Sequence, residues 1–192
     1  MKPTESAYYV THGRISDPGA RAMLLGAMPS DPERLVTAVS RLILHRLFVV
    51  PLGITPHPAS AADVESQTIA RILDRILARD AAPLDVPRPP ERRFIGICRD
   101  YALLACAVLR HHVVPARARV GFANYFTPNF YEGHWVCECH RGDRWRLLDP
   151  ELGGRVRAYL KVSFPPSVRR GVLDPATCSL SSEQVALDVQ VR

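Results

Sequence analysis

Among the residues of this 192-residue chain, the cysteines could take part in the widest range of reactions. They are Cys98, Cys106, Cys137, Cys139 and Cys178. An odd number of cysteines, behind an amino terminus without an apolar signal segment, argues against a disulfide framework. We therefore expect at least one free thiol, and the surrounding sequence favours Cys98 as the reactive one.

Cys98 stands at the predicted start of a helix, two residues after Gly96. A thiol reacts as the thiolate, and its ordinary pKa of about 8.5 leaves little thiolate at neutral pH. The free N–H groups and the positive dipole at a helix start favour the thiolate. A glycine just before allows a tight entry and close approach of a substrate. Cys98 is thus a candidate nucleophile, although a cysteine taken alone is more often a small buried hydrophobe.

A thiol nucleophile needs a base, and His134 is the best placed of the seven histidines. It follows Gly133 at the head of a strand-like segment, and Asp149 closes the next such segment. An imidazole can serve as base and then as acid for a leaving amine, while a carboxylate fixes its tautomer. If the two segments pair as a hairpin, Asp149 can face His134. A slip of one residue would turn Asp149 to the other face.

Aromatic residues near these three could shape a substrate pocket. Residues 124–132 carry Tyr125, Phe126 and Tyr131, which would either line an acyl or peptide pocket or pack on the sheet. Trp135 would fill the core or shield the site from water. Together with Gly96 they form the set of candidate substrate-binding residues.

The segment Cys137-Glu138-Cys139-His140 invites a metal interpretation. Its one-residue spacing is wrong for a zinc knuckle, and no second pair lies at a suitable distance. We therefore expect no metal and no other cofactor. Cys106, eight residues after Cys98 among apolar neighbours, should belong to the core.

Helical signals dominate the first half of the chain. Asp17-Pro18 and Asp31-Pro32 each have the pattern of a cap followed by a proline at the first helical position. The second of these helices should run to about Phe48, because apolar residues recur at steps of three and four.

A third helix is expected after Ser60, which forms with Asp63 a pattern like a capping box. Its buried face would extend from Val64 to Leu77. The four prolines of residues 81–91 then predict a stiff, extended connector.

The second half changes character. Residues 98–111 contain neither glycine nor proline and are rich in alanine and leucine, which predicts the clearest helix of the chain. Strand-like stretches follow at 116–123, 134–140 and 144–149, the last two joined through Arg141-Gly142-Asp143 as a hairpin. Residues 155–163 favour a further strand, and 181–191 fit either a helix or a strand.

A helix followed by a meander of strands is an α+β order. The length fits one domain over residues 1–192. Within it we expect a helical amino-terminal part (1–90), a catalytic core (91–151) and a carboxy-terminal tail (152–192).

Composition excludes several classes of protein. A chain with 47% hydrophobic and 23% charged residues should be soluble and globular. No apolar run approaches the roughly 18 residues needed to cross a membrane, and without a signal segment a cytoplasmic location is expected. The net charge is +6, yet of 25 basic residues only Lys2 and Lys161 are lysine. Scattered arginines are typical of a GC-rich bacterial genome, so we expect no nucleic-acid partner. The oligomeric state is left open.

Four segments in order carry a resemblance to a known family: 96–102 (GICRDYA), 114–122 (VPARARVGF), 132–138 (EGHWVCE) and 144–149 (RWRLLD). They closely resemble the transglutaminase-like superfamily of bacterial proteins, over about residues 91–151. The resemblance implies a papain-like core in which a cysteine-bearing helix packs on an antiparallel sheet. It implies that Cys98 is the nucleophile, His134 its base and Asp149 the residue that orients the histidine.

The same resemblance implies acyl transfer or hydrolysis at an amide or thioester bond, through a thioester on Cys98. Whether water or an amine resolves that thioester stays open. The short tail after Asp149 points to a reduced substrate pocket and to a peptide or small amide substrate. No acidic cluster suggests calcium dependence. The alternative is a binding module that keeps the fold without catalysis.

Overall fold

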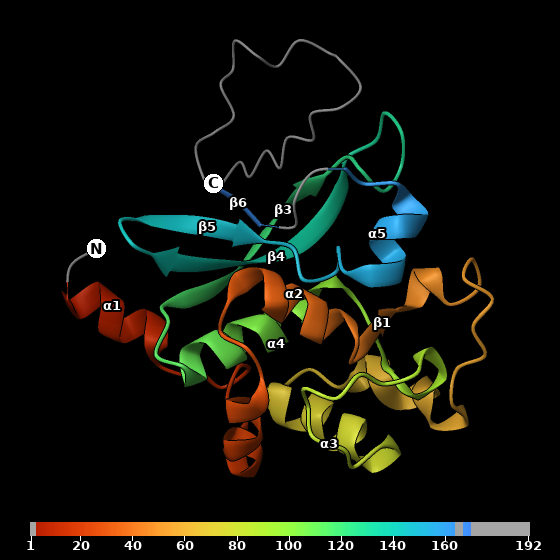
Figure 1. Ribbon diagram of the computed structural model, residues 1–192, viewed down its shortest axis with the longest axis horizontal. Helices are drawn as coiled ribbons and strands as arrows, with labels where there is room; N and C mark the ends of the chain where they lie inside the picture. The colour runs from red at the N-terminus through yellow and green to blue at the C-terminus, as the bar shows by residue number, and fades with distance from the viewer. Residues whose placement is uncertain (1–2, 164–166, 170–192) are drawn as a thin grey trace.

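The computed structural model describes residues 3–163 and 167–169 (Figure 1). The α-helices are α1 (Pro3–Val10), α2 (Pro32–Ser40), α3 (Ile69–Arg79), α4 (Cys98–His111) and α5 (Gly154–Leu160). Short 3-10 helices lie between them: η1 (Gly19–Ala27), η2 (Arg46–Phe48), η3 (Pro58–Glu65) and η4 (Pro90–Arg92). The strands are β1 (Ile43–His45), β2 (Phe94–Gly96), β3 (Ala116–Ala123), β4 (Glu132–Arg141), β5 (Arg144–Leu148) and β6 (Ser167–Arg169).

The elements form two layers around α4. Strands β3, β4, β5 and β6 make an antiparallel sheet in that order, while β1 and β2 form a separate parallel pair. Figure 1 shows α4 between this sheet and α3, and α4 packs on both. The expected α+β class, with a cysteine-bearing helix packed on an antiparallel sheet, is confirmed. Among the described residues, no helix has both the length and the apolar character needed to cross a bilayer.

Helix α4 has the bounds that the sequence predicted. Its residues from Asp100 to Leu109 are buried, and most of its apolar side chains belong to the main hydrophobic core. Asp100 fixes the first turn, because its Oδ2 accepts a hydrogen bond of 2.9 Å from the Ile97 N–H. Local propensity and burial therefore agree along the whole helix.

The prediction that the second helix runs to Phe48 is wrong. Helix α2 begins as expected, with Asp31 accepting from the Arg34 N–H, but it ends at Ser40. Residues 43–45 turn into β1, which pairs in parallel with β2 so that His45 lies opposite Gly96. A short run buried on all sides has no periodicity that distinguishes a strand from a helix, and the distant partner β2 decides the outcome.

The expected start of the third helix is also wrong. Helix α3 begins at Ile69, where the Thr68 hydroxyl accepts from the Arg71 N–H, whereas Ser60 and Asp63 lie in the 3-10 helix η3. Asp63 is not a cap. It is fully buried, pairs with Arg79 and accepts a hydrogen bond of 2.8 Å from the Ile95 N–H.

The proline-rich segment 81–91 is compact rather than extended. The guanidinium of Arg88 is buried at its centre and donates to the carbonyl oxygens of Asp80, Ala82, Pro83 and Val86. The two terminal nitrogens of this planar group, Nη1 and Nη2, make all four of these bonds and satisfy carbonyls that prolines leave without N–H partners nearby. The hydrogen bonds of Arg88 therefore stabilise the compact conformation of this segment.

Residues 155–163 form helix α5 and its end, not a strand. Val156 is buried and Leu160 packs with it against a small second cluster that contains Leu44, Phe48 and Ile95. The spacing of four residues puts both side chains on one helical face. The segment 181–191, for which a helix or strand was expected, lies outside the described residues.

The turn that joins the sheet to α5 packs closely on the end of α2. A Cβ added at Gly153 would collide with the Ser40 side chain and come within 3.1 Å of the Val36 carbonyl oxygen. Gly153→Ala should therefore destabilise the protein by about 1–3 kcal/mol in urea unfolding. Gly13→Ala is the matched control, since nothing lies within 4 Å there. Equal midpoints for the two variants would contradict this packing.

Candidate active site

Helix α4 presents Cys98 at its first residue, beside the end of β2. Cys98 is only partly buried, whereas Cys106, Cys137 and Cys139 are buried in the main core, and all four are free thiols. The described residues contain no group of three or more metal-ligating side chains placed to hold an ion. Cys178 lies outside the described residues. Cys98 is thus the accessible thiol among the described cysteines.

The hairpin of β4 and β5 sets the position of the histidine and the aspartate. Arg141 pairs with Arg144 around Gly142, whose φ is +65°, and Cys137 pairs with Leu148. One further step of this register puts Asp149 beside Val136, on the same face as His134 and diagonal to it. The slip of one residue that would separate them does not occur.

His134 and Asp149 are hydrogen-bonded in the structure. The His134 Nε2 lies 2.8 Å from Asp149 Oδ2, and the two side chains are 2% and 3% exposed. Since Asp149 takes Nε2, the ring leaves Nδ1 for the Cys98 thiol. Burial alone lowers the pKa of His134, but the charge of Asp149 and hydrogen bonds with Asp149 and Cys98 raise it to about 11. The imidazolium is therefore stable beside the thiol at neutral pH.

Tyr125 and Phe126 surround the imidazole. The Tyr125 hydroxyl donates to Asp149 Oδ2, and burial raises the pKa of Tyr125 well above its usual range, so the donor proton is retained. The Phe126 ring lies edge-to-face with His134 at 4.9 Å between centroids. Tyr125 thus helps to orient the carboxylate of Asp149, and the Phe126 ring packs beside the imidazole of His134.

A cavity of about 410 Å³ opens over Cys98 and His134. Its lining also includes His45, Arg46, Leu47, Phe48, Pro51, Ile97, Phe126, Thr127, Glu132, Gly133, Glu151, Tyr159 and Leu160. Of the five candidate substrate-binding residues, only Phe126 is in that lining. The other four, Gly96, Tyr125, Tyr131 and Trp135, are not part of the lining.

Gly96 has a steric role that the sequence did not reveal. A Cβ there would lie 2.9 Å from Asp100 Oδ2, 3.0 Å from Phe94 and 3.1 Å from Ile43. Its lack of a side chain lets β2 and the first turn of α4 approach each other. Tyr131 is 53% exposed, and Trp135 pairs with Val120 on β3.

Sequence reasoning missed the polar residues of the cavity other than His134 and Cys98, among them the buried His45 and Glu151. His45 was assigned to a helix, and only the parallel pairing of β1 with β2 places it beside the start of α4. Glu151 follows Asp149 by two residues, in a turn where its N–H donates to Asp149 Oδ1 at 3.1 Å. Closeness to Asp149 in the sequence was the one signal that could have identified Glu151.

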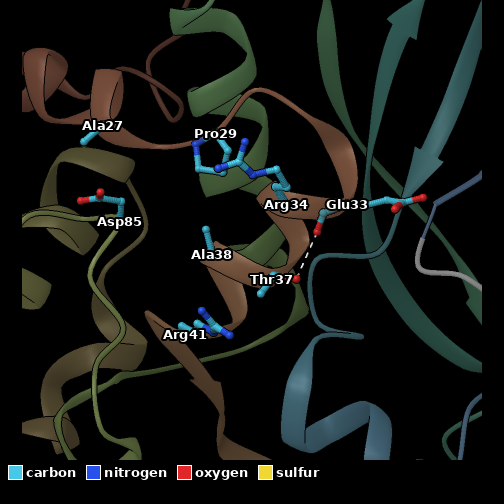
Figure 2. A pocket seen from close by; sticks show the side chains of 8 residues that line it. All are labelled: Ala27, Pro29, Glu33, Arg34, Thr37, Ala38, Arg41 and Asp85. Carbon is cyan, nitrogen blue, oxygen red and sulfur yellow. Dashed lines mark hydrogen bonds between the residues drawn. The ribbon is translucent and has the colours of Figure 1, made fainter.

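A second, open hollow of about 520 Å³ lies along α2 (Figure 2). Figure 2 shows that its lining comes largely from α2, including Glu33 and Arg34, with Arg41 just after the helix and Asp85 from the proline-rich segment. The lining contains neither cysteine nor histidine. It therefore lacks the thiol and imidazole that line the first cavity.

Residues 69–150 match the family model described as the Transglutaminase-like superfamily. No curated protein matches the chain.

One solved structure is similar in fold, that of "a Putative Cysteine Protease from Cytophaga hutchinsonii". Its TM-score is 0.51 at 18% sequence identity, and the alignment covers 88% of this chain and 46% of the other. The chain therefore spans less than half the length of the structure that it matches. Residues 69–150 are therefore similar to the transglutaminase-like superfamily, and the solved structure shows a similar fold.

Proposed function

We propose that this protein is a cysteine-dependent enzyme that transfers or hydrolyses acyl groups at amide or thioester bonds. The observation that carries the proposal is that Cys98 and His134 line one cavity, while the buried Asp149 lies 2.8 Å from the imidazole of His134. A thiol at a helix start, an imidazolium beside it and a buried carboxylate behind it are the parts of an activated thiol nucleophile.

The chemistry follows from these positions. The Cys98 thiolate attacks the carbonyl carbon, a bond forms between sulfur and the acyl group, and the bond to the leaving amine or thiol breaks. His134 gives its proton to that leaving group. Water or an amine then attacks the thioester and gives its proton back to His134. The acid or new amide leaves, and the thiolate is restored.

A non-catalytic binding module is the second candidate. It would account for the fold and the cavity, but it has no need of a buried carboxylate that holds a histidine beside a thiol. The two candidates differ in whether an acyl group becomes attached to Cys98.

Acyl trapping separates them. The protein is mixed with p-nitrophenyl acetate, the released nitrophenol is followed, and mass spectrometry locates the acetyl group. We expect one acetyl group per chain on Cys98, released faster when an amine is added. Cys98→Ala should abolish the adduct, whereas Cys106→Ala, which changes a buried core thiol, should keep it. An adduct on another residue, or none, would support the binding module.

A further inference from the structure

Glu151 is a buried acid at the same cavity as the candidate nucleophile. It is 1% exposed, and neither of its carboxyl oxygens has a hydrogen-bond partner. Its cavity neighbours include Cys98 and His134. A buried polar group left unpaired destabilises the folded protein, and a ligand group that pairs with it would remove that cost.

His45 neither forms a hydrogen bond with the carboxyl group of Glu151 nor neutralises its charge. Its Nδ1 lies 3.9 Å from Glu151 Oε1, which is too far for a hydrogen bond. That nitrogen already accepts from the Leu47 N–H at 3.2 Å. Burial, together with the charges of His134 and Arg46, lowers the pKa of His45 to about 4. The ring is therefore neutral at neutral pH, and the two side chains form no ion pair.

The surroundings of Glu151 favour its neutral form. Burial raises its pKa well above the usual range, and negative charge on Asp149, Cys98 and Glu132 acts in the same direction. His134 opposes this effect, but its charge already faces Asp149 at 2.8 Å. A carboxylic acid kept neutral in this way carries an O–H that can donate a hydrogen bond.

We propose that Glu151 donates a hydrogen bond to the carbonyl oxygen that Cys98 attacks, acting as an oxyanion donor together with the Cys98 backbone N–H. This assignment rests on the proposed acyl chemistry. As sulfur adds to the carbonyl carbon, the oxygen becomes negative and the bond from Glu151 strengthens. A donor fixed in a buried site stabilises that charge without reorganising.

Two substitutions at Glu151 distinguish the effect of its hydrogen-bond donor from the effects of its negative charge and of its side-chain volume. Glu151→Gln keeps a neutral donor of the same shape, and Glu151→Met removes the donor at similar volume. With p-nitrophenyl acetate as the probe, we expect Met to slow acylation of Cys98 about 10²–10³-fold and Gln to keep most of the wild-type rate. A Met variant as fast as wild type would overturn the assignment. So would a Gln variant as slow as Met, because the negative charge would then be what matters.

Alkylation by iodoacetamide provides the control. The reagent is attacked at a saturated carbon and forms no oxyanion, so both variants should react at Cys98 as fast as wild type. Slow alkylation together with slow acylation would reveal a damaged thiol site and overturn the donor role. Failure of the proposed function gives a different result, namely a wild-type protein that p-nitrophenyl acetate does not acylate at Cys98, and it would overturn both proposals.

Discussion

Asp149→Asn is expected to lower the rate of acyl transfer by about 10³–10⁴-fold while leaving the fold intact. Asparagine keeps the size of the side chain, but it removes the negative charge that faces His134 Nε2. The amide can also turn its NH₂ group toward the ring and stabilise the wrong tautomer. The measurement is the rate of Cys98 acylation, with the unfolding midpoint followed alongside it.

The reactivity of Cys98 should also depend on pH differently in the wild type and in Asp149→Asn. In the wild type, Asp149 helps to raise the pKa of His134 to about 11, so the imidazolium should persist beside the thiolate from acid to neutral pH. Without that charge, the effect of burial dominates and lowers the pKa of His134. The imidazolium then loses its proton at lower pH, and iodoacetamide should react slowly with Cys98 near pH 6, where wild type stays reactive.

Asp143→Asn is the matched control. It makes the same chemical change in the turn of the same hairpin, but Asp143 is exposed and contacts Arg144. We expect unchanged acylation and alkylation for this variant. If Asp149→Asn and Asp143→Asn behaved alike, the role of Asp149 in holding His134 would be refuted.

Asp63→Ala is expected to destabilise the protein by about 3–5 kcal/mol, because it leaves a buried arginine without its partner. Asp63 is fully buried and its ion pair with Arg79 is 3% exposed on the arginine side. It also accepts from the Ile95 N–H in β2, three residues before Cys98. One carboxylate therefore joins η3, α3 and the strand that leads into the site.

The test compares the buried ion pair of Asp63 with an ion pair at the surface. Asp74 lies 2.8 Å from Arg21, with side chains 56% and 47% exposed, and Asp74→Ala should cost at most about 1 kcal/mol. Denaturant unfolding measures both. Asp63→Asn should fall between them, since the amide oxygen still accepts from Ile95. A loss for Asp63→Ala no larger than for Asp74→Ala would contradict the structural role.

Features with local causes were predictable from the sequence. Helix α4 follows from a run of good helix formers without glycine or proline, and the β4–β5 hairpin follows from alternation around Gly142. The hairpin then determines that Asp149 can reach His134. The four segments added the resemblance to the transglutaminase-like superfamily, and they pointed to Cys98, His134 and Asp149 as candidate site residues.

Features that depend on distant partners were not predictable. The end of α2 could not be located from the sequence, because residues 43–45 form the strand β1 only through pairing with β2, which lies about fifty residues later in the chain. Ser60 and Asp63 have the spacing of a capping box, yet Asp63 pairs with Arg79 and Ile95. The number of prolines in residues 81–91 indicated a stiff backbone, but it did not indicate that the backbone carbonyls of this segment surround the guanidinium of Arg88.

The sequence by itself determined the class of fold and the cysteine-bearing helix, and it pointed to three candidate residues, because helix propensity, strand alternation and residue type act over short distances. Only the tertiary structure decided what surrounds them. It turned Tyr125 toward Asp149 and brought His45 to the cavity through a parallel strand pair. It also buried Glu151 without a partner. Burial and neighbouring charge set the pKa and hydrogen bonds of each group, and both depend on contacts between segments far apart in the chain.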